Sequence, residues 1–499
     1  MTLSQFARLG GFILVLAGAL VLGVLNSLAA SQTVPLEPAP SADGEMPRHV
    51  PAPDASDHLM DAGQLVPSYQ CGPETPYCGR ACFVGPSGQT WFRADYLYWW
   101  TQGARVVPLV TTSDEEDQGV IGQPSTEILF GDERLNGQGR SNFRIQFGHW
   151  LHCGRTAGIE FDYFTLGEEG TDFRFASNDA GVPLYARPFF DVNPDLQTPG
   201  QNAELVSDPT FLRGTVDGRI DEYFQSAGVN LRLNMICCGP RGCCEDECAA
   251  ACGEDVCGEA CTDDCGSSGC LGNTRAGRYY QGLSGLFSKA CPTSYRVDFL
   301  VGYRHYRLSD SLRVHEDLEA FESTPEIEAG TTFLVTDEFR SRNDFHGAEI
   351  GLVTEAYRGC WSLQLLAKMA FGNNTRIVNI RGESTFQAPD DDPATYEAGI
   401  LAGDETTNGG RHVTNRCAII PQFGAELGYQ LTCRTRAFLG YNLILWNDVA
   451  RASEQVDYTL NSSYFPPADD PTGEARPHFA WQDSDFWAQG VNAGLEYRF

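Results

Sequence analysis

Apolar and polar residues alternate with a period of two along most of the chain after residue 90, a pattern typical of β-strands with two chemically different faces. The last segment is the clearest example: one face is Trp487, Val491, Ala493, Leu495, Tyr497 and Phe499, and the other is Asn492, Gly494, Glu496 and Arg498. Nine further segments repeat the pattern over about ten residues, the length of a tilted strand that crosses a bilayer. They are residues 91–100, 142–151, 157–166, 225–235, 295–304, 345–354, 361–371, 422–431 and 436–446.

This alternation predicts an all-β fold, a closed antiparallel transmembrane β-barrel of about 10–14 strands over residues 91–499. The segments themselves account for ten strands, and the long connections leave room for extra hairpins such as residues 376–382. Tight turns at 152–156, 355–360 and 432–435 alternate with connections of roughly 35 to 55 residues. Such barrels have short periplasmic turns and long external loops, so both chain termini are expected on the periplasmic side.

The same alternation directs charged side chains into the predicted lumen. The basic ones are Arg93, Arg144, Arg232, Arg296, Arg304, Lys368, Arg436 and Arg498, and the acidic ones are Asp95, Glu160, Asp162, Asp298, Glu349, Glu426 and Glu496. Charges in a narrow lumen must pair or be hydrated. Eight bases against seven acids are consistent with interlocking ion pairs across strands and equally with an open pore.

Net charge distinguishes the two ends of the barrel. The chain has a formal net charge of −31, and the predicted external connections carry −26 of it. These connections are residues 101–140, 167–222, 308–343, 372–417 and 447–486. The external loops are therefore expected to be acidic. A nucleic-acid partner is not expected, because binding phosphates requires a basic stripe.

The N-terminus indicates export. Residues 1–30 contain Arg8, an apolar run over 10–25, and the small residues Ala29 and Ala30, which together predict a signal peptide. An uncleaved anchor helix is the alternative interpretation. Residues 31–90 are rich in Pro and Ala and predict an unstructured linker, which also carries Cys71, Cys78 and Cys82.

Residues 236–292 interrupt the alternation with a cysteine-rich insert on the predicted periplasmic side. Ten cysteines fall within 34 residues: Cys237, Cys238, Cys243, Cys244, Cys248, Cys252, Cys257, Cys261, Cys265 and Cys270. In an oxidising compartment such density predicts a disulfide cluster. A zinc site is the rival, although the gaps of three and four residues differ from the usual CxxC spacing. Disulfides to other envelope proteins are a further alternative, since Cys153, Cys291, Cys360 and Cys433 lie on the same predicted side.

Several ordered motifs resemble a known family. They are WFRADYLYWW (91–100), GVIGQPSTEILFG (119–131), LYARPFFDV (184–192), DEFRSRNDFHGAEIGL (337–352), GYNLILWNDVARASEQVD (440–457) and the closing GLEYRF. This set is similar to the planctomycete-type, porin-like outer-membrane proteins known as beta-barrel protein family seven. The resemblance covers about residues 91–499 and implies a porin-like barrel in the bacterial outer membrane with no catalytic residues. The cysteine-rich insert departs from the family pattern.

The chain end also resembles the signal by which outer-membrane barrels are recognised for insertion. Leu495, Tyr497 and Phe499 place alternating apolar side chains before a terminal aromatic residue. This resemblance implies outer-membrane lipid and the barrel-assembly machinery as partners.

Other candidate chemistry has a plainer explanation. The aromatic residues Trp91, Tyr96, Tyr98, Trp99 and Trp100 fit a girdle at the membrane interface better than a sugar-binding surface. The acidic segments 113–118 and 389–393 lack the spacing of a calcium loop and fit solvated surface. His149, His305 and His346 are scattered, and no GxSxG, HExxH or P-loop motif accompanies them. We therefore predict no catalytic, cofactor-binding or metal-binding residues and no enzymatic activity.

Three functions are compatible with these patterns. The first is an outer-membrane barrel that acts as a passive diffusion channel or as a surface protein. The second is a structural envelope protein, cross-linked by disulfides and anchored by its barrel. The third is a secreted, soluble β-sandwich binding protein such as a lectin.

Overall fold

The computed structural model describes residues 88–152, 154–196, 198–238, 294–325, 327–432, 434–468 and 470–499. The predicted signal peptide, nearly all of the linker and the cysteine-rich insert from residue 239 onward lie outside these residues. The described part of the chain contains no helix that is long and apolar enough to span a membrane.

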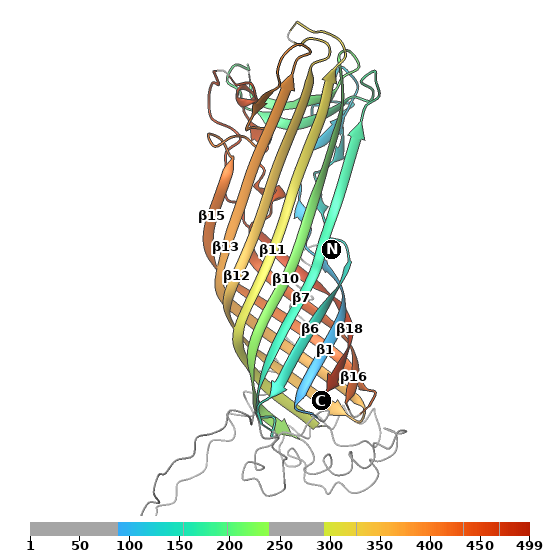
Figure 1. Cartoon of the computed structure of the whole chain (residues 1–499), viewed down its shortest axis with the longest axis vertical. Coiled ribbons are helices and arrows are strands. Elements are labelled where there is room, and N and C mark those ends of the chain that lie inside the picture. The colour runs from blue at the N-terminus through green and yellow to red at the C-terminus, as the bar shows by residue number, and fades with distance from the viewer. Residues whose placement is uncertain are drawn as a thin grey trace, which may run out of the picture. The chain divides into compact units, whose positions relative to one another are not determined.

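Ten antiparallel strands form one hydrogen-bonded ring (Figure 1). The order is β12–β11–β10–β7–β6–β1–β18–β16–β15–β13, and the ring closes because β13 also pairs with β12. The strands are β1 (Thr90–Thr101), β6 (Arg140–Trp150), β7 (Ala157–Ala176), β10 (Leu212–Cys238), β11 (Ser294–Ala320), β12 (Thr332–Arg358), β13 (Trp361–Gln387), β15 (Gly410–Gln430), β16 (Thr435–Val449) and β18 (Ser484–Arg498). Each of the ten predicted segments falls in a different strand of this ring, which confirms the all-β, barrel-like fold.

The tight turns predicted from the sequence gather at one end of the ring, which we call the turn end. The turn between β12 and β13 is the shortest, since Arg358 pairs directly with Trp361. Gly359 adopts a φ of 57° there, the left-handed conformation that a two-residue hairpin turn requires. This turn sets the register of the two strands, because a slip by one residue would exchange their faces.

The strands are longer than the sequence predicted. β10, β11, β12 and β13 have 27 residues each, and only residues 321–331 separate β11 from β12. Most of the predicted external connection over 308–343 is therefore strand, and residues 376–382 belong to β13 instead of an extra hairpin. The expectation of long external loops was wrong here, because the alternation continues with its polarity reversed.

Away from the turn end, the strands β7, β10, β11, β12, β13 and β15 continue beyond the other four, and we call this part the extension (Figure 1). A small sheet packs inside it, formed by β3 (Val110–Thr112), β4 (Glu127–Phe130), β8 (Tyr185–Asp191), β9 (Gly200–Ser207) and β17 (Thr459–Leu460). Smaller elements are β2 (Ala104–Arg105), β5 (Arg134–Leu135), β14 (Ala394–Tyr396), η2 (Ser453–Gln455) and η3 (Ser462–Tyr464).

The extension has a conventional apolar core. Val216, Ile220, Leu312, Val314, Phe339, Val378 and Ile380 on the long strands pack with Val106, Leu109, Val110, Phe189 and Val206. Charged residues such as Arg219, Asp317 and Arg381 point outward from the same strands. This arrangement of apolar residues inside and charges outside is that of a water-soluble β-protein.

The ring near the turn end has the opposite polarity. On β13, the outward residues Trp361, Leu363, Met369 and Phe371 are 38–53% exposed, whereas Ser362 and Lys368 face inward and are buried. The terminal residues Leu495, Tyr497 and Phe499 also point outward and are 39–63% exposed. A continuous apolar surface of this kind requires an apolar environment.

Candidate functional site

The ring interior is the candidate site, because the charged residues predicted for the lumen meet there. The structure places all fifteen on the inward faces of ring strands, and none is more than 7% exposed. Their ion pairs fall into three neighbouring groups, and Arg232 of the third also lies 3.5 Å from Glu160 of the first.

The first group centres on Arg304 of β11. Its guanidinium donates to both carboxylate oxygens of Asp162, at 2.5 and 2.8 Å, and to both of Glu349, at 2.7 Å. The Lys368 ammonium lies 3.4 Å from Glu349 Oε1 and 3.9 Å from Glu160 Oε1. Four strands are thus connected by one cluster of buried charges.

The second group lies beside it and centres on Asp95 and Glu426. Arg93 Nε donates to Asp95 Oδ1 at 2.8 Å, and Arg93 Nη2 donates to Glu426 Oε1 at 2.5 Å. Arg144 binds the same two carboxylates. The Arg93 guanidinium also stacks over the Phe438 ring, 3.7 Å from its centroid, so its flat face is covered as well.

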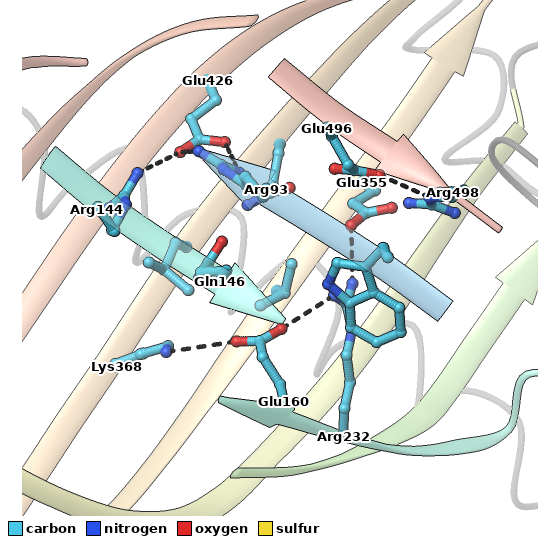
Figure 2. A pocket seen from close by; sticks show the side chains of 14 residues that line it. Arg93, Arg144, Gln146, Glu160, Arg232, Glu355, Lys368, Glu426, Glu496 and Arg498 are labelled. Carbon is cyan, nitrogen blue, oxygen red and sulfur yellow. Dashed lines mark hydrogen bonds and ion pairs between the residues drawn. The ribbon is translucent and has the colours of Figure 1, made fainter. Parts of the chain in front are cut away.

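The third group lies toward the turn end (Figure 2). Arg232 donates to Asp298 at 2.6 Å and to Glu355 at 2.8 Å, and Arg296 also binds Asp298. Arg436 and Arg498 both bind Glu496 at 2.6 Å. Trp150 covers this layer, with its ring 4.3 Å from the Arg296 guanidinium carbon.

Glu355 was missed by the sequence prediction, which assigned residues 355–360 to a turn. With Glu355, the interior set holds eight acidic and eight basic side chains. The alternation already contained the signal, because Glu355 continues the inward face of Glu349 and Val353 on β12. This balance fits a closed network of ion pairs better than a charged pore.

These side chains are closely surrounded by one another, and a small cavity lies between them. The cavity shown in Figure 2 has a volume of about 30 Å³ and is lined by Arg93, Arg144, Glu160, Arg232, Glu355 and Lys368 among others. That volume accommodates about one water molecule.

A layer of aromatic residues lies next to the charged groups on the side of the extension. Phe224 is at its centre, with its ring 5.0 Å from Phe486, 5.4 Å from Phe164 and 6.0 Å from Tyr306. Trp99, Phe345 and Trp446 complete the layer, and each of them is at most 1% exposed. We call this set the aromatic layer.

The five aromatic residues of β1 that were assigned to a girdle at the membrane interface fall into two groups. The prediction that all five belong to this girdle was therefore wrong. Tyr96 and Tyr98 point outward and are 56% and 44% exposed, whereas Trp91 and Trp99 face the ring interior and are 4% and 0% exposed. The reason is strand geometry: Trp91 and Trp99 share the face of Arg93 and Asp95. Trp100 is half-buried on the outer face.

A further ion cluster lies between the aromatic layer and the extension core. Glu222 binds both Arg140 and Arg451, and Arg451 also binds Asp310. All four are at most 6% exposed. The sequence prediction placed these residues in external loops, so their pairing across four segments of the chain was missed.

The extension holds a separate buried cluster of acids around one arginine. Arg187 lies 2.6 Å from Glu316 and 2.7 Å from Asp337, and Glu204 of β9 is its cross-strand neighbour in the backbone register of β8 and β9. Burial, together with the neighbouring charge of Glu316, raises the pKa of Glu204 to about 7. Burial also raises the pKa of Glu316.

The histidines and acidic segments have mostly local partners. His149 contacts Thr90 Oγ1 at 2.8 Å, and Asp117 in the segment 113–118 accepts hydrogen bonds from Ser125, which lower its pKa. His305 and His346, in contrast, are cross-strand neighbours with ring centroids 4.6 Å apart, a pairing that the sequence prediction missed. No group of three or more metal-ligating side chains occurs within the described ranges.

Of the predicted cysteine cluster, only Cys237 and Cys238, at the end of β10, belong to the described residues, and Cys237 is disulfide-bonded. The other eight lie outside them. The disulfide pattern of the insert therefore stays a prediction.

A family model described as "Putative beta barrel porin-7 (BBP7)" matches residues 91–499. No curated protein matches the chain. Among solved structures, the outer membrane protease OmpT of Escherichia coli is 9% identical, covers 82% of this chain and 97% of its own, and has a TM-score of 0.34. The toluene transporter TodX of Pseudomonas putida is 11% identical, with 83% and 90% covered and a TM-score of 0.19. At these TM-scores the likeness carries no argument about this chain.

Proposed function

Because this chain belongs to the beta barrel porin-7 family, we propose that it is an outer-membrane β-barrel whose filled ring anchors the extension at the bacterial cell surface. The observation that carries this proposal is the filled interior. The charged groups, the aromatic layer and the cluster of Glu222, Arg140, Arg451 and Asp310 follow one another along the ring axis, and the side chains that form them are almost completely buried. Passive diffusion of solutes would require all three layers to move.

Insertion into a membrane is supported by the length of the apolar outer face. On β13 this face runs from Trp361 to Phe371, and the next outward residues are Asn373 and Thr375. Eleven residues match the span of a tilted strand, about 9–11 residues. A strand of 27 residues is about 90 Å long, so more than half of it extends beyond the hydrocarbon core. The turn end is then periplasmic and the extension external.

Conductance tests the sealed interior. Refolded protein in a planar bilayer is expected to give no single-channel steps, because the aromatic layer blocks the ring. The variant Phe224→Ala/Trp446→Ala removes two members of this layer and is also expected to stay closed, because the buried charged groups still fill the ring. Regular steps from the wild-type protein would overturn the sealed anchor and favour a diffusion channel.

Surface display is tested separately. A peptide tag inserted in the connection 321–331 lies at the outer end of β11 and β12, and the matched control tag lies in the turn 359–360 at the opposite end. Antibody added to intact cells is expected to bind the first tag and not the second. Binding to the turn-end tag alone would reverse the proposed orientation.

Cross-linking of the envelope is a second candidate function, prompted by the ten cysteines that the insert carries between residues 237 and 270. The partner would be another envelope protein joined through the insert. Non-reducing gels of isolated envelope test it: ladders that collapse on reduction support cross-linking, and a discrete monomer refutes it. No enzymatic activity is part of either proposal, and the barrel-assembly machinery is the proposed partner during insertion.

A further inference from the structure

The outer face of the ring changes from apolar to polar at one register of its strands. Tyr303, Ala348, Phe371 and Ile419 are outward neighbours on β11, β12, β13 and β15 and form the last apolar row. The next row toward the extension is His305, His346, Asn373 and Cys417, and the row after it is Arg307, Asp344, Thr375 and Asn415. These rows lie where the apolar face ends.

Four arginines occupy outward positions beyond this boundary. Arg307, Arg340, Arg342 and Arg411 fall within three consecutive rows on β11, β12 and β15, and we call them the arginine patch. The carboxylates beside them are Asp344 and Glu338, so the patch keeps a net positive charge. On the adjoining strand β10, Asp221 is already paired with Arg219 at 2.6 Å. A positive patch is unexpected on a chain with a net charge of −31, and it calls for an anionic partner.

One buried carboxylate orients the two arginines closest to the apolar face. Arg307 Nε lies 2.6 Å from Asp344 Oδ1, and Arg342 Nε lies 2.8 Å from Asp344 Oδ2. The Asp344 side chain is 11% exposed, whereas those of Arg307 and Arg342 are 37% and 48% exposed. Since both arginines contact Asp344 through Nε, their terminal nitrogens remain available for another acceptor. Two guanidinium groups held side by side suit a phosphate, which accepts hydrogen bonds from several N–H groups at once.

We propose that the arginine patch binds the phosphate of an anionic lipid headgroup in the external leaflet. The location selects a lipid over a soluble anion, because a lipid whose chains cover Tyr303 and Ala348 places its headgroup near two arginines of the same strands. Arg307 lies four residues beyond Tyr303 on β11, and Arg342 lies six residues beyond Ala348 on β12. Asp344 acts as a positioning residue that aims Arg307 and Arg342 at this headgroup. The inference rests on the proposed insertion of the ring into a membrane.

The test compares two charge-matched variants. Arg307→Gln/Arg342→Gln removes two positive charges beside the apolar face. Arg313→Gln/Arg381→Gln removes two charges from exposed arginines on β11 and β13 that share one row, three rows beyond Arg307 and two rows beyond Arg342. Arg313 is six residues, about 20 Å, from Arg307 along β11, which is well beyond the screening length in physiological salt. The two variants therefore have the same net charge and differ in position.

Each protein, in micelles of an uncharged detergent, is titrated with phosphatidic acid or phosphatidylcholine, and bound lipid is counted by native mass spectrometry. Wild-type protein is expected to bind phosphatidic acid at least about fivefold more tightly than phosphatidylcholine, since one arginine near an anionic headgroup contributes about 1 kcal/mol. Arg307→Gln/Arg342→Gln is expected to lose this preference, and Arg313→Gln/Arg381→Gln is expected to keep it. An excess of inorganic phosphate is expected to leave the bound phosphatidic acid in place.

Three results would overturn the inference: no preference in the wild type, equal losses in the two variants, or displacement of the lipid by inorganic phosphate. The last would show that the patch binds a soluble anion. Heat-modifiable mobility on gels, measured after reconstitution into phosphatidylcholine bilayers, separates this inference from the proposed function. A ring that inserts without lipid preference refutes the inference alone, and a ring that fails to insert refutes the proposed function.

Discussion

The ring and the extension are built from the same strands with opposite polarity. Along β12, Ile350 points outward and is 42% exposed, and Glu349 is buried inside. Eleven residues earlier on the same strand, Glu338 points outward and Phe339 is buried inside. The backbone and its hydrogen bonds continue unchanged between them. Alternation therefore specifies the strand, and the polarity of each face specifies the solvent around it.

The interiors differ as the outer faces do. The ring is filled by ion pairs and the extension by aliphatic and aromatic side chains. A lipid-facing barrel gains nothing from an apolar stripe directed inward, whereas an external domain in water needs an apolar core. Substitutions in the ring and in the extension should therefore have different effects.

Loss of a buried ion pair in the ring should lower the free energy of unfolding far more than loss of an exposed ion pair in the extension. Arg304→Gln leaves Asp162 and Glu349 buried with fewer partners and is expected to lower the free energy of unfolding by about 3–5 kcal/mol. Arg213→Gln breaks the half-exposed pair with Glu319 and is expected to cost about 1 kcal/mol or less. Urea unfolding in micelles measures both, and similar losses would contradict the contrast.

Two phenylalanines on β12 compare the two interiors directly. Phe339 belongs to the extension core and Phe345 to the aromatic layer, and both are 0% exposed. Replacement of either by alanine is expected to cost about 3–5 kcal/mol of local stability. Phe339→Ala should expose the extension to protease while the ring stays folded on unheated gels. If Phe339→Ala unfolds the ring as well, the two regions do not open separately.

A new outward charge should be tolerated in the extension and not in the ring. Ile350→Arg places a charge on the apolar outer face and is expected to cost about 2–4 kcal/mol in a bilayer. Thr336→Arg, at an outward position of the same strand in the extension, should change stability by about 0.5 kcal/mol or less. Folding yields in phospholipid vesicles provide the measurement, and an equal cost at the two positions would refute the assigned boundary.

The acid cluster of the extension should make it, and not the ring, sensitive to mild changes of pH. The pKa of Glu204 rises to about 7 on folding, so the folded extension holds a proton that the unfolded chain releases near its ordinary, lower pKa. The stabilisation that this proton gives is present in full at a pH below the pKa of Glu204 in the unfolded chain. It is lost as the pH rises through about 7, the pKa of Glu204 in the folded state. The loss should be about 1 kcal/mol or less, because this side chain is partly solvated.

Protease resistance of the extension at pH 5 and pH 8 measures this effect. Glu204→Gln should remove the difference, and a variant that keeps it would show that another group titrates.

The sequence predicted the strands of the ring and the inward direction of fifteen charges, because both follow from alternation within about ten residues. It did not predict the extension, since a search for an apolar outward stripe ends where polarity reverses, near Asn373 on β13. The inward direction of Glu355 was not predicted, because this residue was assigned to a turn. The cluster of Glu222, Arg140, Asp310 and Arg451 joins residues up to 311 positions apart, a pairing that no local pattern encodes.

The uninterrupted 27-residue strands have a mechanical consequence. Where a linker would allow an outer domain to swivel, β10 to β13 continue from one region into the other with their cross-strand hydrogen bonds intact. Any force on the extension is transmitted along these strands as shear, which loads many hydrogen bonds together. The extension must therefore keep a fixed angle to the ring, because no flexible segment separates the two.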